Sequence, residues 1–122
     1  MSGVNLGDGV FDVTSYAMTG LTRRAELRAN NIANAETPNF RAKTVDFESI
    51  LSQRLRSGEV ADLGMGPAGI ETLRDNYVDV NGNSVDLEVE TTEMIQDNLM
   101  FQAVINGFNY KADVLRSAIG GR

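Results

Sequence analysis

The chain of 122 residues has a length typical of one small domain, and 42% of its residues are hydrophobic. It contains neither cysteine nor histidine, which excludes disulfides, thiolate chemistry and the commonest general base near neutral pH. The formal net charge of −6 argues against a nucleic-acid partner, because phosphate backbones attract basic surfaces. The sequence also lacks a nucleophile-and-base spacing and a phosphate-binding glycine loop, so we expect no enzymatic activity, no cofactor and no bound metal.

The first residues lack the basic region and apolar run of a cleaved secretory signal. The sequence also contains no apolar stretch of about 18 residues that could span a membrane. We therefore expect a protein that has no cleaved signal peptide and no membrane span.

The first predicted element is an amphipathic helix within residues 1–34. Its stripe follows alternating steps of three and four residues, the spacing of one helix face, and consists of Phe11, Thr14, Met18, Leu21, Ala25, Arg28 and Ile32. Asp12 is a candidate N-cap, although the helix could begin a turn earlier. Pro38 disfavours helical geometry at Thr37, so the helix should end near Asn34 after about 30 Å.

The middle segment, residues 35–85, should contain a turn, a short helix and a loop-rich insert. Pro38-Asn39 suits the two central positions of a tight turn, because asparagine tolerates positive φ. An extended segment should follow at 40–45. Asp46 is the predicted N-cap of a short helix that ends at Gly58.

Two alternatives remain for the end of the glycine-rich stretch 58–84. Alternating residues at 77–80 and 84–87 flank an Asn81-Gly82 step, a combination typical of a β-hairpin. The competing interpretation, which we prefer, begins the last helix near residues 85–86.

Residues 86–122 carry the most regular helical pattern of the chain. The stripe again alternates steps of four and three residues, and it consists of Met94, Asn98, Phe101, Ile105, Phe108, Ala112, Leu115 and Ile119. Acidic residues near its start favour the helix dipole, and Gly120-Gly121 should end it after about 50 Å.

The middle of the chain joins the end of one long helix to the start of the other, so the two should run antiparallel. One register pairs the apolar residues of the two stripes: Ile32 with Met94, Ala25 with Phe101, Leu21 with Ile105, Met18 with Phe108 and Phe11 with Leu115. In this register Arg24 and Arg28 approach the acids Glu93 and Asp97, which adds charge complementarity.

The predicted fold is mainly α, with long N- and C-terminal helices packed antiparallel like a coiled coil, a short middle helix and a loop-rich insert that has the β-hairpin as its alternative. Such a pair of helices leaves apolar residues without a partner inside the chain, namely Val10, Val13, Ile95, Leu99 and Val104. Their burial would drive association, at roughly 1.5–3 kcal/mol for each large side chain. We therefore expect the termini to order on assembly, whereas an ordinary helical bundle core is the competing interpretation.

The end of the first helix resembles the N-terminal motif of bacterial flagellar axial proteins. The usual motif is Asn-Ile-Ala-Asn, a small residue, Asn or Asp, and Thr-Pro-Gly-Tyr; here Asn39 and Phe40 stand in the last two places, and Glu36 also departs from it. The segment 82–88 is similar to that of the basal-body rod protein family, in particular its proximal rod member. The motif and turn residues are Asn30, Asn31, Ile32, Ala33, Asn34, Thr37, Pro38, Asn39 and Phe40.

The resemblance implies a structural subunit whose terminal helices, through their stripes, pack into the inner tube of the periplasm-spanning rod. It implies a helical array that transmits torque and encloses an export channel, with export by the flagellar type III route. The implied partners are copies of the chain, other rod proteins, the rod-base adaptor, and MS-ring or export-gate proteins. In that setting Asn30, Asn31 and Asn34 would bond the backbone at the helix end, with solvated helix capping as the alternative.

Two other functions are weighed against this one. Asp79, Asn81, Asn83 and Glu90 have the spacing of calcium-loop ligands, but Ser84 occupies the place of the required glycine. The stronger alternative is a helical adaptor or chaperone-like binding module that uses the same stripes on one partner in a closed complex.

Overall fold

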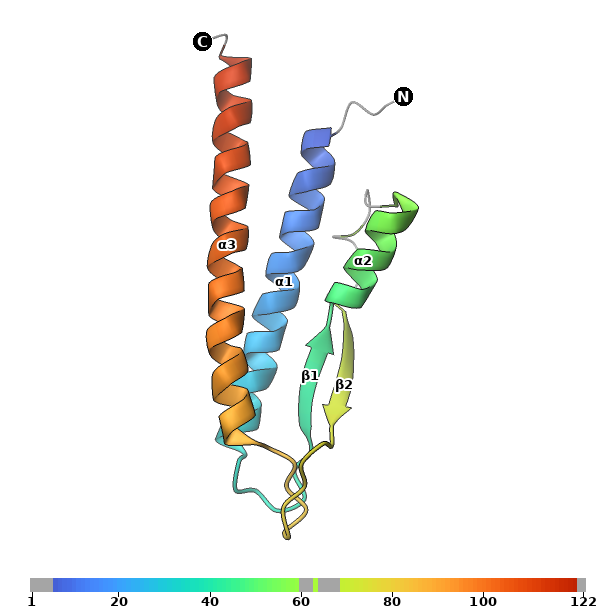
Figure 1. Ribbon diagram of the computed structural model, residues 1–122, viewed down its shortest axis with the longest axis vertical. Coiled ribbons are helices and arrows are strands. Elements are labelled where there is room, and N and C mark those ends of the chain that lie inside the picture. Colours follow the sequence, from blue (N-terminus) through green and yellow to red (C-terminus); the bar gives the residue numbers. More distant parts are fainter. Residues whose placement is uncertain (1–5, 60–62, 64–68, 121–122) are drawn as a thin grey trace.

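The structure is a computed structural model that describes residues 6–59, 63 and 69–120. Its elements are α1 (Leu6–Ala33), β1 (Ala42–Asp46), α2 (Glu48–Ser57), β2 (Ile70–Arg74) and α3 (Leu87–Ile119). α1 lies between α3 on one side and the β1–β2 sheet with α2 on the other (Figure 1). The predicted mainly α fold with long terminal helices and a short middle helix is confirmed, and none of the described helices is long and apolar enough for a membrane span.

The two long helices run antiparallel, so the free ends of α1 and α3 lie at the same end of the molecule (Figure 1). α1 begins before the predicted cap Asp12 and ends at Ala33, beside the predicted stop. Its 28 residues make it about 42 Å long, longer than predicted. α3 begins at Leu87, which confirms the preferred interpretation that the last helix starts near residues 85–86. Asp86 is its N-cap, because the Asp86 carboxylate accepts the N–H groups of Glu88 (3.1 Å) and Val89 (3.3 Å).

The extended segment after the motif turn becomes β1, which pairs antiparallel with β2 in a two-stranded sheet. Of the alternative hairpin at 77–80 and 84–87 only the turn forms: Gly82 N–H donates to the carbonyl of Asp79 (2.9 Å) and Asp79 N–H to that of Asn83 (2.8 Å), but no strands flank this turn, so the predicted strands are wrong. The reason is that the backbone of Ser84 bonds elsewhere, to the carbonyl of Phe40 (3.0 Å). The loop therefore closes a tight turn and then binds the segment after the motif turn, so the turn does not extend into a pair of strands.

Phe47 occupies the N-cap position of α2, and the predicted cap Asp46 lies one residue before it but still binds the first turn of the helix. Its carboxylate accepts the backbone N–H (3.0 Å) and the hydroxyl (2.7 Å) of Ser49, and these hydrogen bonds lower the pKa of Asp46. Gly58 closes the helix with a φ of 77°, as the sequence predicts.

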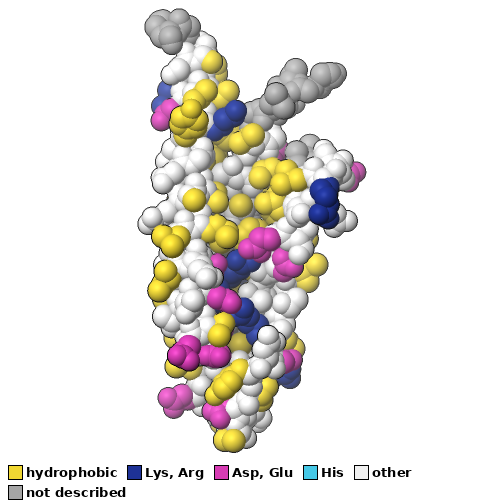
Figure 2. Space-filling view, in the orientation of Figure 1, with side chains coloured by type: hydrophobic (Ala, Val, Ile, Leu, Met, Phe, Trp, Pro, Cys, Tyr) yellow, Lys and Arg dark blue, Asp and Glu magenta, His cyan; other side chains and the backbone are white. Residues whose placement is uncertain are grey.

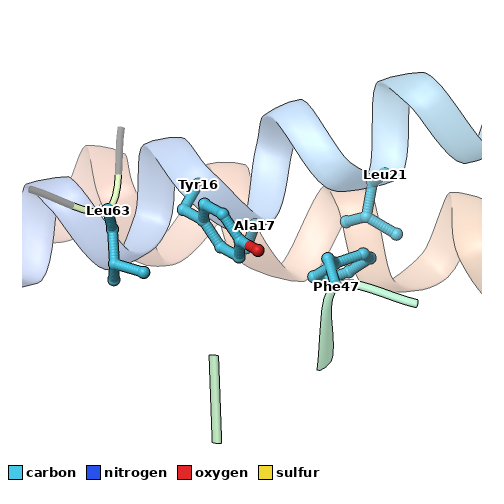
Figure 3. Close-up of a cluster of buried hydrophobic side chains, with 5 residues drawn as sticks. All are labelled: Tyr16, Ala17, Leu21, Phe47 and Leu63. Carbon is cyan, nitrogen blue, oxygen red and sulfur yellow. The ribbon is translucent and has the colours of Figure 1, made fainter. Parts of the chain in front are cut away.

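A small apolar core lies where α1 meets the segment around the start of α2 (Figure 3). Its buried members are Tyr16, Ala17, Leu21, Phe47 and Leu63, with Val13, Ile50, Leu51, Phe101 and Val104 packed around them. The rings of Tyr16 and Phe47 meet edge to face, with centroids 6.5 Å apart. Burial of Leu21 and Phe47 thus ties α1 to the middle of the chain.

The predicted register of the long helices is wrong by about one heptad. Each residue of α1 lies beside a residue of α3 about seven positions earlier than predicted, so α3 extends further past the free end of α1. Phe11 was paired with Leu115, but its ring packs on Phe108 with centroids 4.9 Å apart. The predicted approach of Arg24 and Arg28 to acids of α3 is confirmed, because long arginine side chains reach several positions along a neighbouring helix.

α3 leaves most of its apolar surface uncovered. Glu90 is the one buried side chain reported for this helix, whereas Ile95 is 56% and Leu99 64% exposed. Figure 2 shows apolar side chains on the surface along the edge formed by α3. Of the residues predicted to lack a partner, Val10 is also exposed, but Val13 and Val104 pack on the apolar core, which corrects that part of the prediction.

Two mid-helix glycines should respond in opposite ways to alanine. A Cβ at Gly20 would lie 2.8 Å from the Cβ of Phe47 and nearer still to its ring, whereas a Cβ at Gly107 meets nothing within 4 Å. Gly20→Ala should therefore lower the free energy of unfolding by about 1–3 kcal/mol. Gly107→Ala should raise it by about 0.5–1 kcal/mol, because alanine favours the helix. Urea unfolding of the dilute chain measures both, and equal shifts would contradict the packing described.

Candidate functional site

Among the residues that the structure describes, the buried polar side chains all lie at one end of the molecule, where α1 ends and α3 begins. They are Arg28, Asn31, Asn83, Ser84 and Glu90, and we call them the joint. Each is at most 4% exposed, so each must find its partners inside the protein. The joint therefore determines how three separate stretches of chain meet.

Asn31 binds the motif helix to β1 as a backbone peptide would. Its Nδ2 donates to the carbonyl of Lys43 (2.8 Å), and its Oδ1 accepts the N–H of the same residue (3.0 Å). Nδ2 also lies 3.3 Å from Oε2 of Glu90 on α3. One amide thus connects α1, β1 and α3.

Asn83 and Ser84 bind the loop that precedes α3 to the motif turn. The amide of Asn83 donates to the carbonyls of Asn34 (2.8 Å) and Thr37 (2.7 Å), and its oxygen accepts the N–H of Val85 (2.8 Å). The Ser84 hydroxyl accepts the N–H of Ala42 (2.7 Å). The motif turn is therefore held from outside as well as by its own bonds.

Three other motif residues, which are exposed or half-buried, form a local network at the end of α1. Asn34 donates to the carbonyl of Asn30 (2.9 Å), and its side-chain oxygen accepts the Thr37 hydroxyl (3.1 Å). Asn39 has a φ of 63°, the positive value that the turn prediction required. The structure thus brings Asn31 into the joint, while the side chain of Asn34 bonds the backbone at the helix end and the side chain of Asn30 accepts from that of Asn34.

The centre of the joint is the ion pair between Arg28 and Glu90, with side chains 4% and 2% exposed. Nη1 of Arg28 lies 2.9 Å from Oε1 of Glu90, and Nη2 lies 2.6 Å from a carboxylate oxygen of Asp97. Glu93 is a further partner of Nη1 at 3.5 Å. Breaking such a buried pair on one side costs about 3–5 kcal/mol, because the remaining charge is left without a partner.

Two more arginines surround this pair. Arg24 donates to the carbonyl of Val45 (2.9 Å), pairs with Glu48 and Asp97, and stacks over the ring of Phe47 at 4.7 Å. Burial alone would lower the pKa of Arg24, but its bonds to Glu48 and Asp97 raise it overall. Arg74 of β2 pairs with Glu93 (2.7 Å), and this hydrogen bond raises the pKa of Arg74. Figure 2 shows charged side chains gathered on this face.

The predicted stripe residues are divided between the core and the surface. Leu21 is buried, Phe11, Met18 and Ile32 are half-buried, and Ala25 is exposed. On α3 the half-buried members are Phe101, Ile105, Phe108, Ala112 and Leu115, while Met94 and Ile119 are exposed. Neither stripe is fully covered within the described chain.

The calcium-loop alternative finds no support in the joint. Asn83 bonds backbone groups of the motif turn, and Glu90 is bound to Arg28 and Asn31. Within residues 6–59, 63 and 69–120, no group of three or more acidic side chains is arranged to hold a metal ion.

The central role of Arg28 and Glu90 is not predicted from the sequence pattern, although the sequence contains one signal for it. Arg28 interrupts an apolar stripe and lies three residues before Asn31, on the same face of α1. A cation on a core-facing position requires a buried acid. The sequence could therefore have indicated a buried partner, but which of the acids at 90, 93 or 97 would be buried depends on the register.

The fold and the joint define an elongated structural subunit, in which polar contacts connect two long helices whose outer faces remain exposed. No protein-family model matches the chain. Relatives named flagellar basal body rod protein FlgB align over most of its length. The relative from Cereibacter sphaeroides is 33% identical over 89% of this chain and 92% of its own. Those from Bacillus subtilis (97% of this chain, 98% of the relative) and Aeromonas hydrophila (93% and 95%) are each 28% identical.

The chain belongs to the FlgB family of flagellar basal body rod proteins. It is a structural component of the rod in the flagellar basal body.

Replacing Asn31 should be far more costly than replacing its neighbour. Asn31→Ala leaves the N–H and carbonyl of Lys43 without their side-chain partner and should lower the free energy of unfolding by about 1–3 kcal/mol. Asn30→Ala removes the same atoms from an exposed position and should cost less than about 0.5 kcal/mol. Urea unfolding compares the two, and similar losses would show that the buried contacts of Asn31 add nothing to stability.

Part of the loss of stability on acidification should come from Glu93. Burial alone would raise the pKa of this carboxyl, but the hydrogen bond from Arg74 and the charge of Arg28 hold it below the ordinary value of 4.5. Because the folded pKa is the lower one, the contribution of Glu93 is complete above the unfolded pKa and is lost as pH falls through the folded pKa.

Glu93→Gln should therefore destabilise the chain at about pH 7 and have a smaller effect at about pH 3. Glu36→Gln, the same change on an exposed side chain, is the control and should have little effect at either pH. Chemical unfolding at both pH values tests this. An effect of Glu93→Gln that does not change with pH would contradict the assignment.

Proposed function

We propose that this chain is a subunit of the proximal rod that assembles helically through its terminal helices into a torque-transmitting shaft around an export channel. The observation that carries the proposal is the uncovered apolar face of α3, where Leu99 is 64% and Tyr110 72% exposed. Large exposed apolar faces mark interaction sites, and a 33-residue helix presents one along its whole length. Membership in the FlgB family supports the rod as its place of assembly.

The proposed division of labour follows the chain. Residues 1–34 and 86–122 form the inner-tube domain, and residues 35–85 form the motif turn, the short helix and the insert that leave it. The assembly stripes are those of the sequence prediction, from Phe11 to Ile32 and from Met94 to Ile119. The joint supports this division because its hydrogen bonds fix the orientation of the middle segment, residues 35–85, relative to both long helices.

The proposed partners are copies of the chain, other rod proteins, the rod-base adaptor, and the MS-ring or export-gate proteins. The proposed route to the rod is flagellar type III export without a cleaved signal peptide. The acidic composition and the apolar outer face support protein partners over nucleic acid.

An adaptor or chaperone-like module in a closed complex remains the second candidate, because an uncovered helix face suits either architecture. The rod subunit and the adaptor differ in whether their assembly closes. Contacts between like subunits that do not close give an open array, whereas an adaptor complex has a fixed number of members. Electron cryomicroscopy of basal bodies that contain the chain distinguishes them.

A charge on the outer face of α3 should prevent assembly without unfolding the subunit. Leu99→Glu places a carboxylate on a side chain that is already 64% exposed, so the circular dichroism of the dilute chain should not change. In a strain that lacks its own copy, this variant should abolish swimming and leave basal bodies without the rod segment.

The matched control adds the same charge on a different face. Gln53 is exposed on α2, away from the uncovered face of α3 that carries Leu99, so Gln53→Glu should restore swimming as the unchanged chain does. Normal rods with Leu99→Glu would refute the proposed interface. Loss of rods with both variants would show a general effect of added charge.

A further inference from the structure

The apolar stripes of α1 and α3 do not by themselves select one register. Phe11 packs on Phe108, and because the stripes repeat every seven residues, a slide of one heptad would place Leu115 there instead. That slide gives the register which the apolar pattern alone predicts. No apolar side chain in the described part of α3 is buried. Of the two α3 residues that pack on the apolar core, Phe101 would be replaced by Phe108 and Val104 by Lys111, whose long side chain can carry its charge to water.

The polar contacts between the helices do distinguish them. Arg28 meets three carboxylates, those of Glu90, Glu93 and Asp97. After the slide these places would be taken by Asp97, Met100 and Val104. Arg28 would keep one acid in place of three.

Glu90 would lose the most. It is 2% exposed and receives Arg28 at 2.9 Å and Asn31 at 3.3 Å from α1, with Arg74 of β2 at 3.7 Å. Glu93 and Asp97 are 33% and 14% exposed, so water can partly replace their partners. A slide therefore separates the buried carboxylate of Glu90 from Arg28 and Asn31, and water cannot replace them. It also leaves the Arg28 guanidinium with fewer acidic partners.

We infer that Glu90 is the residue that fixes the register of α3 on α1, and that the apolar stripes only hold the helices together. Buried polar groups are known to specify register in this way, because the wrong register leaves them without partners. The register also determines how far α3 extends beyond the free end of α1 (Figure 1). A slide of one heptad would withdraw α3 by about 10 Å.

Disulfide trapping in the full chain tests this, because the native sequence has no cysteine. Phe11→Cys with Phe108→Cys reports the observed register, and Phe11→Cys with Leu115→Cys reports the slid one. In the otherwise unchanged chain the first pair should oxidise at least about tenfold more completely than the second.

Arg28→Met with Glu90→Gln removes the ion pair and keeps the net charge. Asp97 retains Arg24 and Glu93 retains Arg74, so no other charge is left alone. In this background the yields of the two cysteine pairs should come within about threefold of each other. The loop at 82–86 is untouched, so a retained preference for the first pair in a helical protein would show that the loop sets the register, and would overturn the inference.

A second background keeps the test decisive if that double variant does not fold. Glu90→Gln with Met100→Glu moves the acid to an exposed position that faces Arg28 only after the slide. The pair at Phe11 and Leu115 should then give a higher yield than in the unchanged chain, because Arg28 meets two acids in either register instead of three in one and one in the other. A yield no higher than in the unchanged chain would overturn the inference, whichever result the first background gives.

Discussion

The ion pair of Arg28 and Glu90 is the contact on which the rest of the structure depends. It is enclosed where α1, α3 and the sheet meet, and its members have almost no access to water. A buried ion pair adds little net stability, because desolvation offsets most of the attraction. Its effect is on geometry: the charges must meet, so the helices that carry them have one relative position.

The joint also contains two asparagine side-chain amides, which bond backbone groups as another peptide would. Asn31 bonds both peptide groups of Lys43, and Asn83 bonds two carbonyls of the motif turn. An asparagine side chain has one acceptor and two donor hydrogens, so it can pair with irregular backbone that no strand or helix satisfies. The loops at this end are therefore held by side-chain hydrogen bonds, although they follow no regular path.

Much of the fold could be predicted because local rules decide it. The helix stop before Pro38, the positive φ of Asn39, the cap at Asp86 and the stop at Gly58 follow from steric and hydrogen-bonding preferences of single residues.

What could not be predicted depends on contacts between distant residues. β2 lies in a glycine-rich stretch with no strand pattern, and it forms because β1 offers an edge. The burial of Glu90, and of no other acid of α3, follows from a register that a seven-residue repeat leaves ambiguous. The free ends of both helices lie together, far from the joint (Figure 1). A force that pulls those ends apart would separate the helices one contact after another, beginning with Phe11 and Phe108. The ion pair of Arg28 and Glu90 would be the last contact to bear the force.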